Sequence, residues 1–220
     1  MNTPASRQGN FVRYTVYLIS YLLVAGVRSL TIRATDVRLW GIILFASVSL
    51  MTLIFYVYRF NREQRFFSRS FVLPWLGNIG LTIGLTLIVV LARLLISYEQ
   101  AKGVLPQYGY QVAYAKYESV RLFWFLIAAQ GFVLPILQSY LSVGFFFNYW
   151  FRRSTRLSAV LGLIGSGVIF SLLSFQPNMV LLLVNFLWGV LLAWSYLYTQ
   201  TLWMPIYLSI LNGVLMVILA

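Results

Sequence analysis

Two adjacent polar residues, Gln138 and Ser139, lie in the middle of an otherwise apolar stretch, FVLPILQSYLSVGFFFNYWFRR (132–153). Their side chains can form hydrogen bonds, and a Ser hydroxyl can act as a nucleophile when a general base lies beside it. Amide and hydroxyl oxygens are neutral, so they are weak ligands for a divalent metal ion and poor proton acceptors. The chemistry open to this pair therefore depends on the polar groups that the fold brings to it.

Few such groups are available, because the 220-residue chain contains neither His nor Cys. This composition removes the commonest general base, the thiolate nucleophile and the commonest zinc ligands. The four acidic residues, Asp36, Glu63, Glu99 and Glu118, are predicted to lie in or beside loops. We therefore predict no catalytic residue, no metal ligand and no cofactor.

The composition predicts an integral membrane protein. Hydrophobic residues make up 61% of the chain and charged residues 9%, whereas soluble domains carry roughly 25% charged residues. The 16 Lys and Arg outnumber the 4 Asp and Glu, but they cluster at the ends of apolar runs, where they face lipid phosphates. The lipid bilayer is thus the predicted partner, and nucleic acid is not.

Seven apolar segments approach the roughly 20 residues that a membrane-spanning helix needs. They are too long and too continuous for the strands of a barrel. The prediction is an all-α, polytopic membrane helix bundle of about seven helices in a single domain, 1–220, whose first helix is retained rather than cleaved. The segments are approximately 11–27, 39–58, 71–97, 121–149, 157–175, 179–198 and 202–219.

The basic residues between these segments predict an orientation. Nine lie in the N-terminal tail and in the links after the second and fourth segments, and six lie in the links on the opposite side. The larger group is expected to be cytoplasmic. This places the N-terminus inside a bacterial cell and, with seven spans, the C-terminus outside.

Two features outside the opening stretch have both a structural and a functional interpretation. The long connection 98–119 contains five tyrosines, which form either an interfacial aromatic belt or a docking surface for a partner. Arg93 is expected near the outer end of its span, where its side chain either extends to the headgroups or serves as a functional charge. The tyrosines are Tyr98, Tyr108, Tyr110, Tyr114 and Tyr117.

Three patterns follow one another in the second half of the chain: QSYLSVG (138–144), FSLLS (170–174) and SILNG (209–213). Their order and framing residues resemble the CPBP family of intramembrane metalloproteases, which includes CAAX prenyl proteases and the bacteriocin-processing, or Abi, proteins. The resemblance implies a CPBP-like core at about 120–217, preceded by additional N-terminal helices within 11–97.

The resemblance also implies which positions are altered. The family motifs are E-E-x-x-x-R-G, F-x-x-x-H and H-x-x-x-N, in which the Glu and His residues hold a metal ion and activate a water. Uncharged residues occupy the corresponding positions here, so the resemblance implies a pseudoenzyme. The altered positions are Gln138, Ser139, Val143, Ser174, Ser209 and Gly213.

These polar residues, together with Ser142 and Asn212, have two interpretations. They either form hydrogen bonds between packed membrane helices, or line a retained pocket for a lipid or a peptide end. The functional hypotheses follow from this choice. The first is a non-catalytic scaffold or regulatory partner of another cell-envelope protein. Relatives lacking the metal ligands are associated with cell-wall hydrolases, sensor kinases or bacteriocin immunity in Gram-positive bacteria. The alternatives are a small membrane subunit of a transporter and an active intramembrane protease.

Overall fold

The computed structural model describes residues 7–33, 37–64, 73–75, 77–117, 119–150 and 156–219, and all regular secondary structure in this part of the chain is helical. The elements in chain order are α1 (Arg7–Arg33), α2 (Leu39–Glu63), α3 (Ile79–Ala101), α4 (Gly109–Tyr117), α5 (Val120–Leu126), η1 (Ile127–Val133), α6 (Leu134–Ser139), η2 (Tyr140–Phe145), α7 (Phe146–Trp150), α8 (Arg156–Leu173), α9 (Met179–Thr199) and α10 (Trp203–Ile218).

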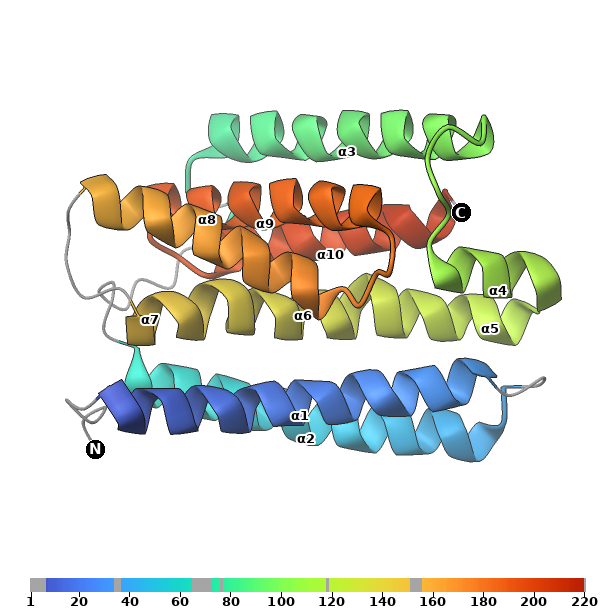
Figure 1. The fold of residues 1–220 in the computed structure, drawn as a ribbon, viewed down its shortest axis with the longest axis horizontal. Helices are drawn as coiled ribbons and strands as arrows, with labels where there is room; N and C mark the ends of the chain where they lie inside the picture. Colours follow the sequence, from blue (N-terminus) through green and yellow to red (C-terminus); the bar gives the residue numbers. More distant parts are fainter. Residues whose placement is uncertain are drawn as a thin grey trace.

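The helices form a bundle whose long members run along one common direction (Figure 1). The continuous helix from α5 to α7 lies in the middle, with the α1–α2 hairpin on one side and α8, α9 and α10 on the other. Helix α3 lies at the far edge, where it packs against α10. Helix α1 begins and helix α10 ends at opposite ends of the bundle, as expected for an odd number of crossings (Figure 1).

Within the described residues, six helices are long and apolar enough to cross a membrane, and α10 is a shorter apolar helix of 16 residues. The predicted polytopic helix bundle is therefore confirmed, and the protein is a multi-pass membrane protein. The cytoplasmic or external placement of each end stays a prediction. Several of the arginines behind it, among them Arg65, Arg69, Arg152 and Arg153, lie outside the described residues.

The central span is one continuous helix from Val120 to Trp150. Two segments within it, η1 and η2, have π-helical geometry in place of α-helical geometry. The first of them ends just before Pro135, which occupies the first turn of α6. Proline has no backbone N–H, and the wider π turn accommodates that missing donor inside a long helix. Such π segments are frequent at functional sites, and both flank Gln138 and Ser139.

Glycines set the close approach of α8 and α9. A Cβ atom built on Gly189 would lie 2.6 Å from Phe170 Cβ and 2.8 Å from Gly167 Cα. Small residues of this kind let two membrane helices approach until their backbones are in contact. The helix pair carries the second motif on α8, so this contact positions Phe170 relative to the rest of the core.

Replacing Gly189 with Ala is expected to lower the free energy of unfolding by about 2 kcal/mol, because the added methyl group meets backbone atoms that cannot move aside. Gly84→Ala is the matched control: a Cβ there meets nothing within 4 Å, and Ala has the higher helix propensity. Denaturant titration in detergent measures both. Equal stability of the two variants would contradict the close contact between α8 and α9.

Glu63 attaches the N-terminal hairpin to the central helix. Its carboxylate, 2% exposed, accepts hydrogen bonds from Arg13 at 3.1 Å and Tyr17 at 3.1 Å, and lies 2.6 Å from Arg59. The Tyr149 hydroxyl, on α7, also donates to it. Glu63 is the last residue of α2, so it lies beside a loop as predicted, but its side chain is buried between α1, α2 and α7.

The connection 98–119 is not the exposed loop that the sequence predicts. Helix α3 continues to Ala101, and Gly109–Tyr117 forms α4. Tyr108 and Tyr110 are buried, and the Tyr110 hydroxyl donates to the Met216 carbonyl at 3.2 Å. This burial raises the pKa of the Tyr110 phenol well above its ordinary value. A docking role for these two tyrosines is therefore wrong.

Of the other three tyrosines of this connection, two are less buried than Tyr108 and Tyr110. Tyr98 is 56% exposed, Tyr114 is half-buried against Phe123, and the side chain of Tyr117 lies outside the described part of the structure. Exposed residues of this connection include Tyr98 near the end of α3, Val104 in the turn that follows and Val112 on α4. The Lys102 ammonium lies 4.2 Å from the centre of the Tyr98 ring.

Candidate functional site

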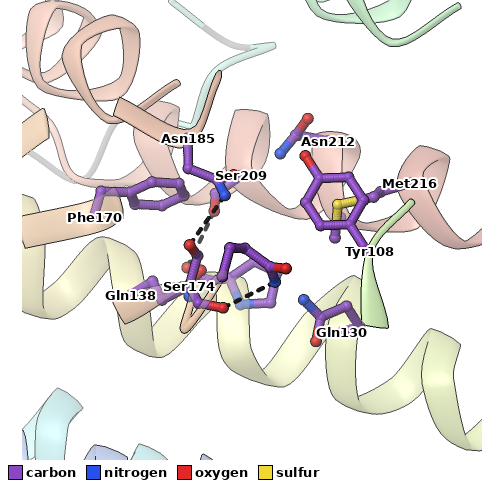
Figure 2. A pocket seen from close by; sticks show the side chains of 12 residues that line it. Tyr108, Gln130, Gln138, Phe170, Ser174, Asn185, Ser209, Asn212 and Met216 are labelled. Carbon is purple, nitrogen blue, oxygen red and sulfur yellow. Dashed lines mark hydrogen bonds between the residues drawn. The ribbon is translucent and has the colours of Figure 1, made fainter. Parts of the chain in front are cut away.

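The three sequence motifs meet at one small polar pocket (Figure 2). Gln138 comes from α6, Ser174 from the turn after α8, and Ser209 and Gly213 from α10. The cavity has a volume of about 20 Å³, enough for about one water molecule. Its lining residues are Tyr108, Gln130, Pro135, Gln138, Phe170, Ser174, Gln176, Asn185, Ser209, Asn212, Gly213 and Met216.

The two serine hydroxyls on the pocket wall donate to main-chain carbonyls. Ser174 donates to the Ser171 carbonyl at 2.6 Å and Ser209 to the Pro135 carbonyl at 3.2 Å. Ser142 does not line the pocket; it donates to the carbonyl of Gln138, one helical turn earlier, at 2.7 Å. A carbonyl oxygen is not a general base, so none of these hydrogen bonds activates a serine as a nucleophile.

Gln138 connects three helices. Its amide nitrogen donates to the Tyr21 hydroxyl of α1 at 2.8 Å and to the Leu173 carbonyl at 3.2 Å, and Tyr21 donates to the same carbonyl at 2.7 Å. A buried polar network in which the donors are satisfied holds its members in one arrangement. This geometry is that of a contact between helices.

Two of the six altered positions do not line the pocket. Ser139 and Val143 are fully buried beside it, and the Ser139 hydroxyl has no hydrogen-bond partner in the described structure. The motif that holds an adjacent pair in the sequence therefore contributes only Gln138 to the pocket wall.

Arg93 is the largest fully buried side chain in the described structure, at 1% exposure. Its Nε donates to Asn212 Oδ1 at 2.6 Å, and its guanidinium lies 5.6 Å from the centre of the Tyr108 ring and 5.5 Å from that of Trp188. The expectation that Arg93 extends to the lipid headgroups is wrong. Its position on α3 faces α10, and the aromatic rings replace the headgroups as its surroundings.

A second arginine approaches from the opposite helix. Arg28 Nη1, on α1, donates to Gln130 Oε1 at 2.5 Å, and Gln130 lines the pocket. The position of Arg28 in the sequence indicates only a charge in a link between spans. Gln130, Asn185 and Tyr108 line the pocket without having been predicted to do so. Isolated amides within apolar spans were the available signal, since polar groups at membrane depth face the bundle interior.

Comparison with known proteins identifies part of the chain. Residues 119–215 match the family described as Type II CAAX prenyl endopeptidase Rce1-like. This segment is Rce1-like. The resemblance to the CPBP family inferred from the three motifs is thus confirmed, while the first 118 residues lie outside the match. No curated protein and no solved structure gives a significant match to the chain.

The Rce1-like family implies a metal ion at the motif positions, and the donor set found there does not fit one. The oxygen atoms of Gln130 and Asn212 accept hydrogen bonds from arginines, and the hydroxyls of Ser174 and Ser209 are directed to carbonyls. Every residue on the pocket wall is uncharged. A divalent cation requires anionic or strongly basic ligands, and two nearby guanidinium groups would repel it.

Proposed function

We propose that this Rce1-like membrane protein is non-catalytic and acts as a scaffold or regulatory partner of another cell-envelope protein. The observation that supports this most directly is the pocket at the motif positions, where neutral side chains form hydrogen bonds between helices. Associations of such proteins with cell-wall hydrolases, sensor kinases or bacteriocin immunity in Gram-positive bacteria define the partner classes to test.

The size of the pocket argues against the two alternatives. A space of about 20 Å³ holds no peptide bond with its flanking side chains and no transported organic solute. A protease would have to open the Gln138–Tyr21 contact before a substrate entered. A transporter subunit would have to separate α10 from η1.

The proposed contact with a partner is the turn between α3 and α4. Tyr98 and Val104 are 56% and 67% exposed, and Lys102 lies over the Tyr98 ring. Tyrosine is enriched in protein interfaces. On the predicted orientation this turn lies outside the cell, where the extracellular domain of an envelope protein could reach it.

Co-purification of the full chain in mild detergent tests the scaffold role. A stoichiometric partner is expected with the wild type and is expected to be lost, by at least tenfold, with Tyr98→Ser combined with Val104→Ser. Leu157→Ser is the matched control, because Leu157 is 71% exposed at the start of α8, far along the chain from the turn. Recovery of the chain without a partner would contradict the proposal.

Metal analysis and a cleavage assay test the absence of catalysis. We expect no stoichiometric zinc in the purified chain and no cleavage of a prenylated peptide in vesicles. One equivalent of bound zinc together with cleavage that a chelator abolishes would overturn the proposal.

A further inference from the structure

The amides of Gln130 and Asn212 are held in one orientation by the two arginines behind them. A carboxamide has one accepting oxygen and one donating NH₂ group, whereas a guanidinium only donates. Arg28 and Arg93 therefore engage the two oxygens, at 2.5 and 2.6 Å. The nitrogen of each amide is left on the pocket side, as Figure 2 shows for both residues.

These NH₂ groups have no acceptor. Both residues line the pocket, and no described residue accepts a hydrogen bond from either nitrogen. The Tyr108 hydroxyl also lines the pocket, is buried at 1% exposure and has no partner. Three donors thus surround a space that offers them no anionic acceptor.

The surroundings are also positively charged. Arg93 Nη2 and Arg28 Nε are buried without partners, and neither arginine forms an ion pair within the described part of the chain. A buried cation without a counter-ion is costly, because the low-dielectric interior screens its charge weakly. A negative charge in the pocket would offset that cost for both arginines.

We propose that the pocket binds one monatomic anion of the halide class, with chloride as its occupant. The volume of about 20 Å³ has room for a single small species and excludes phosphate, carboxylate-bearing ligands and lipid headgroups. The anion accepts hydrogen bonds from the amide nitrogens of Gln130 and Asn212 and from Tyr108. Arg28 and Arg93 polarise the two amides from behind and supply the compensating charge.

This site would lock the N-terminal helices onto the Rce1-like segment. Arg28 comes from α1 and Arg93 from α3, both outside residues 119–215, while Gln130 and Asn212 lie inside them. Binding of the anion therefore stabilises the contact between the two parts of the chain. The inference is independent of the proposed scaffold role, since a structural halide is compatible with any partner.

Thermal unfolding of the full chain in detergent tests the proposal, with sodium chloride or sodium bromide replacing sodium gluconate at constant ionic strength. A saturable rise in Tm of about 5 to 10 °C is expected at a hundredfold excess over Kd. An identical Tm in gluconate and in chloride would overturn the proposal and leave a water as the occupant.

Asn212→Asp is the decisive variant. It replaces the donating NH₂ by an anionic oxygen of the same shape and gives Arg93 an internal counter-ion, so the halide response should vanish while folding persists without halide. Gln130→Glu makes the same change beside Arg28 and decides the matter if Asn212→Asp does not fold. Asn78→Asp, the same chemical change at the N-cap of α3, should retain the full response.

A halide response in Asn212→Asp and Gln130→Glu equal to that of the wild type would place any bound anion elsewhere and overturn the assignment. Crystals grown in bromide give a direct readout. An anomalous peak is expected between Gln130, Asn212 and Tyr108, and its absence there in a chain that responds to bromide would also overturn the assignment.

Discussion

Replacing Glu63 with Ala is expected to lower the free energy of unfolding by about 3 kcal/mol, one of the two largest effects predicted for a single substitution in this chain. The carboxylate is 2% exposed and accepts from Arg13, Tyr17 and Tyr149. Its removal leaves buried donors unsatisfied and two cations without their counter-ion. Arg13 and Arg59 are about a quarter exposed, at 25% and 26%, so solvent or headgroups recover part of the loss.

Two further variants separate charge from packing. Glu63→Gln keeps the volume, removes the charge and replaces one accepting oxygen by a donating NH₂ group, so most of the loss should already appear in this variant. Glu99→Gln is the control, because Glu99 is half-buried and forms no ion pair in the described structure. Its stability should stay within about 0.5 kcal/mol of the wild type.

Denaturant titration in detergent measures the stability of each variant. Limited proteolysis shows whether the α1–α2 hairpin detaches from α7, as the position of Glu63 requires. Wild-type stability of Glu63→Gln would show that the ion pairs contribute nothing, as many exposed pairs do.

The membrane spans could be predicted because the thickness of the bilayer core sets the length of an uninterrupted apolar run. The sequence segments 39–58 and 179–198 correspond to α2 and α9, within a few residues at each end. Helix α4 was not predicted. It is a nine-residue helix, and its short length produces no clear apolar period.

Arg93 shows what the position of a charge in the sequence does and does not determine. Its distance from the end of the span is compatible with a side chain that reaches the headgroups. The direction of the side chain depends on the face of the helix. Thr82, Arg93 and Gln100 form a polar stripe on α3, all three are buried, and such a stripe faces the bundle interior. The stripe was visible in the sequence, and the partner, Asn212, was not.

The motifs located half of the pocket wall, since six of its twelve lining residues belong to them: Gln138, Phe170, Ser174, Ser209, Asn212 and Gly213. They could not indicate which residues close it. Tyr21, Arg28, Arg93 and Tyr108 come from the part of the chain outside the Rce1-like match, and only the packing of α1 and α3 brings them there.

Restoring the residue that the family motif has at position 213 is expected to damage the fold. Gly213→Asn should lower the free energy of unfolding by about 3 kcal/mol, because a Cβ atom there would lie 2.5 Å from the Gln130 carbonyl oxygen, 2.8 Å from Pro135 Cγ and 3.1 Å from the Gly131 carbonyl oxygen. Backbone carbonyls cannot rotate away, so α10 would have to separate from η1.

The variant Gly213→Ala separates the contribution of the Cβ atom from that of the Asn carboxamide. The clash begins at the Cβ atom, so Ala should already account for most of the loss of stability, and the carboxamide group of Asn should add less. Asn212→Ala is the neighbouring control, because it removes side-chain atoms at the adjacent position and introduces no steric clash. Its effect should follow the halide concentration, whereas that of Gly213→Ala should not.

The outcome also bears on catalysis. If Gly213→Asn unfolded with the stability of the wild type, α10 and η1 would have room to move apart, and the pocket could open to admit a substrate. A loss of about 3 kcal/mol would instead mean that α10 and η1 are packed too closely to admit a substrate between them. Reintroducing the family's polar residues one at a time would then fail for steric reasons before any metal could bind.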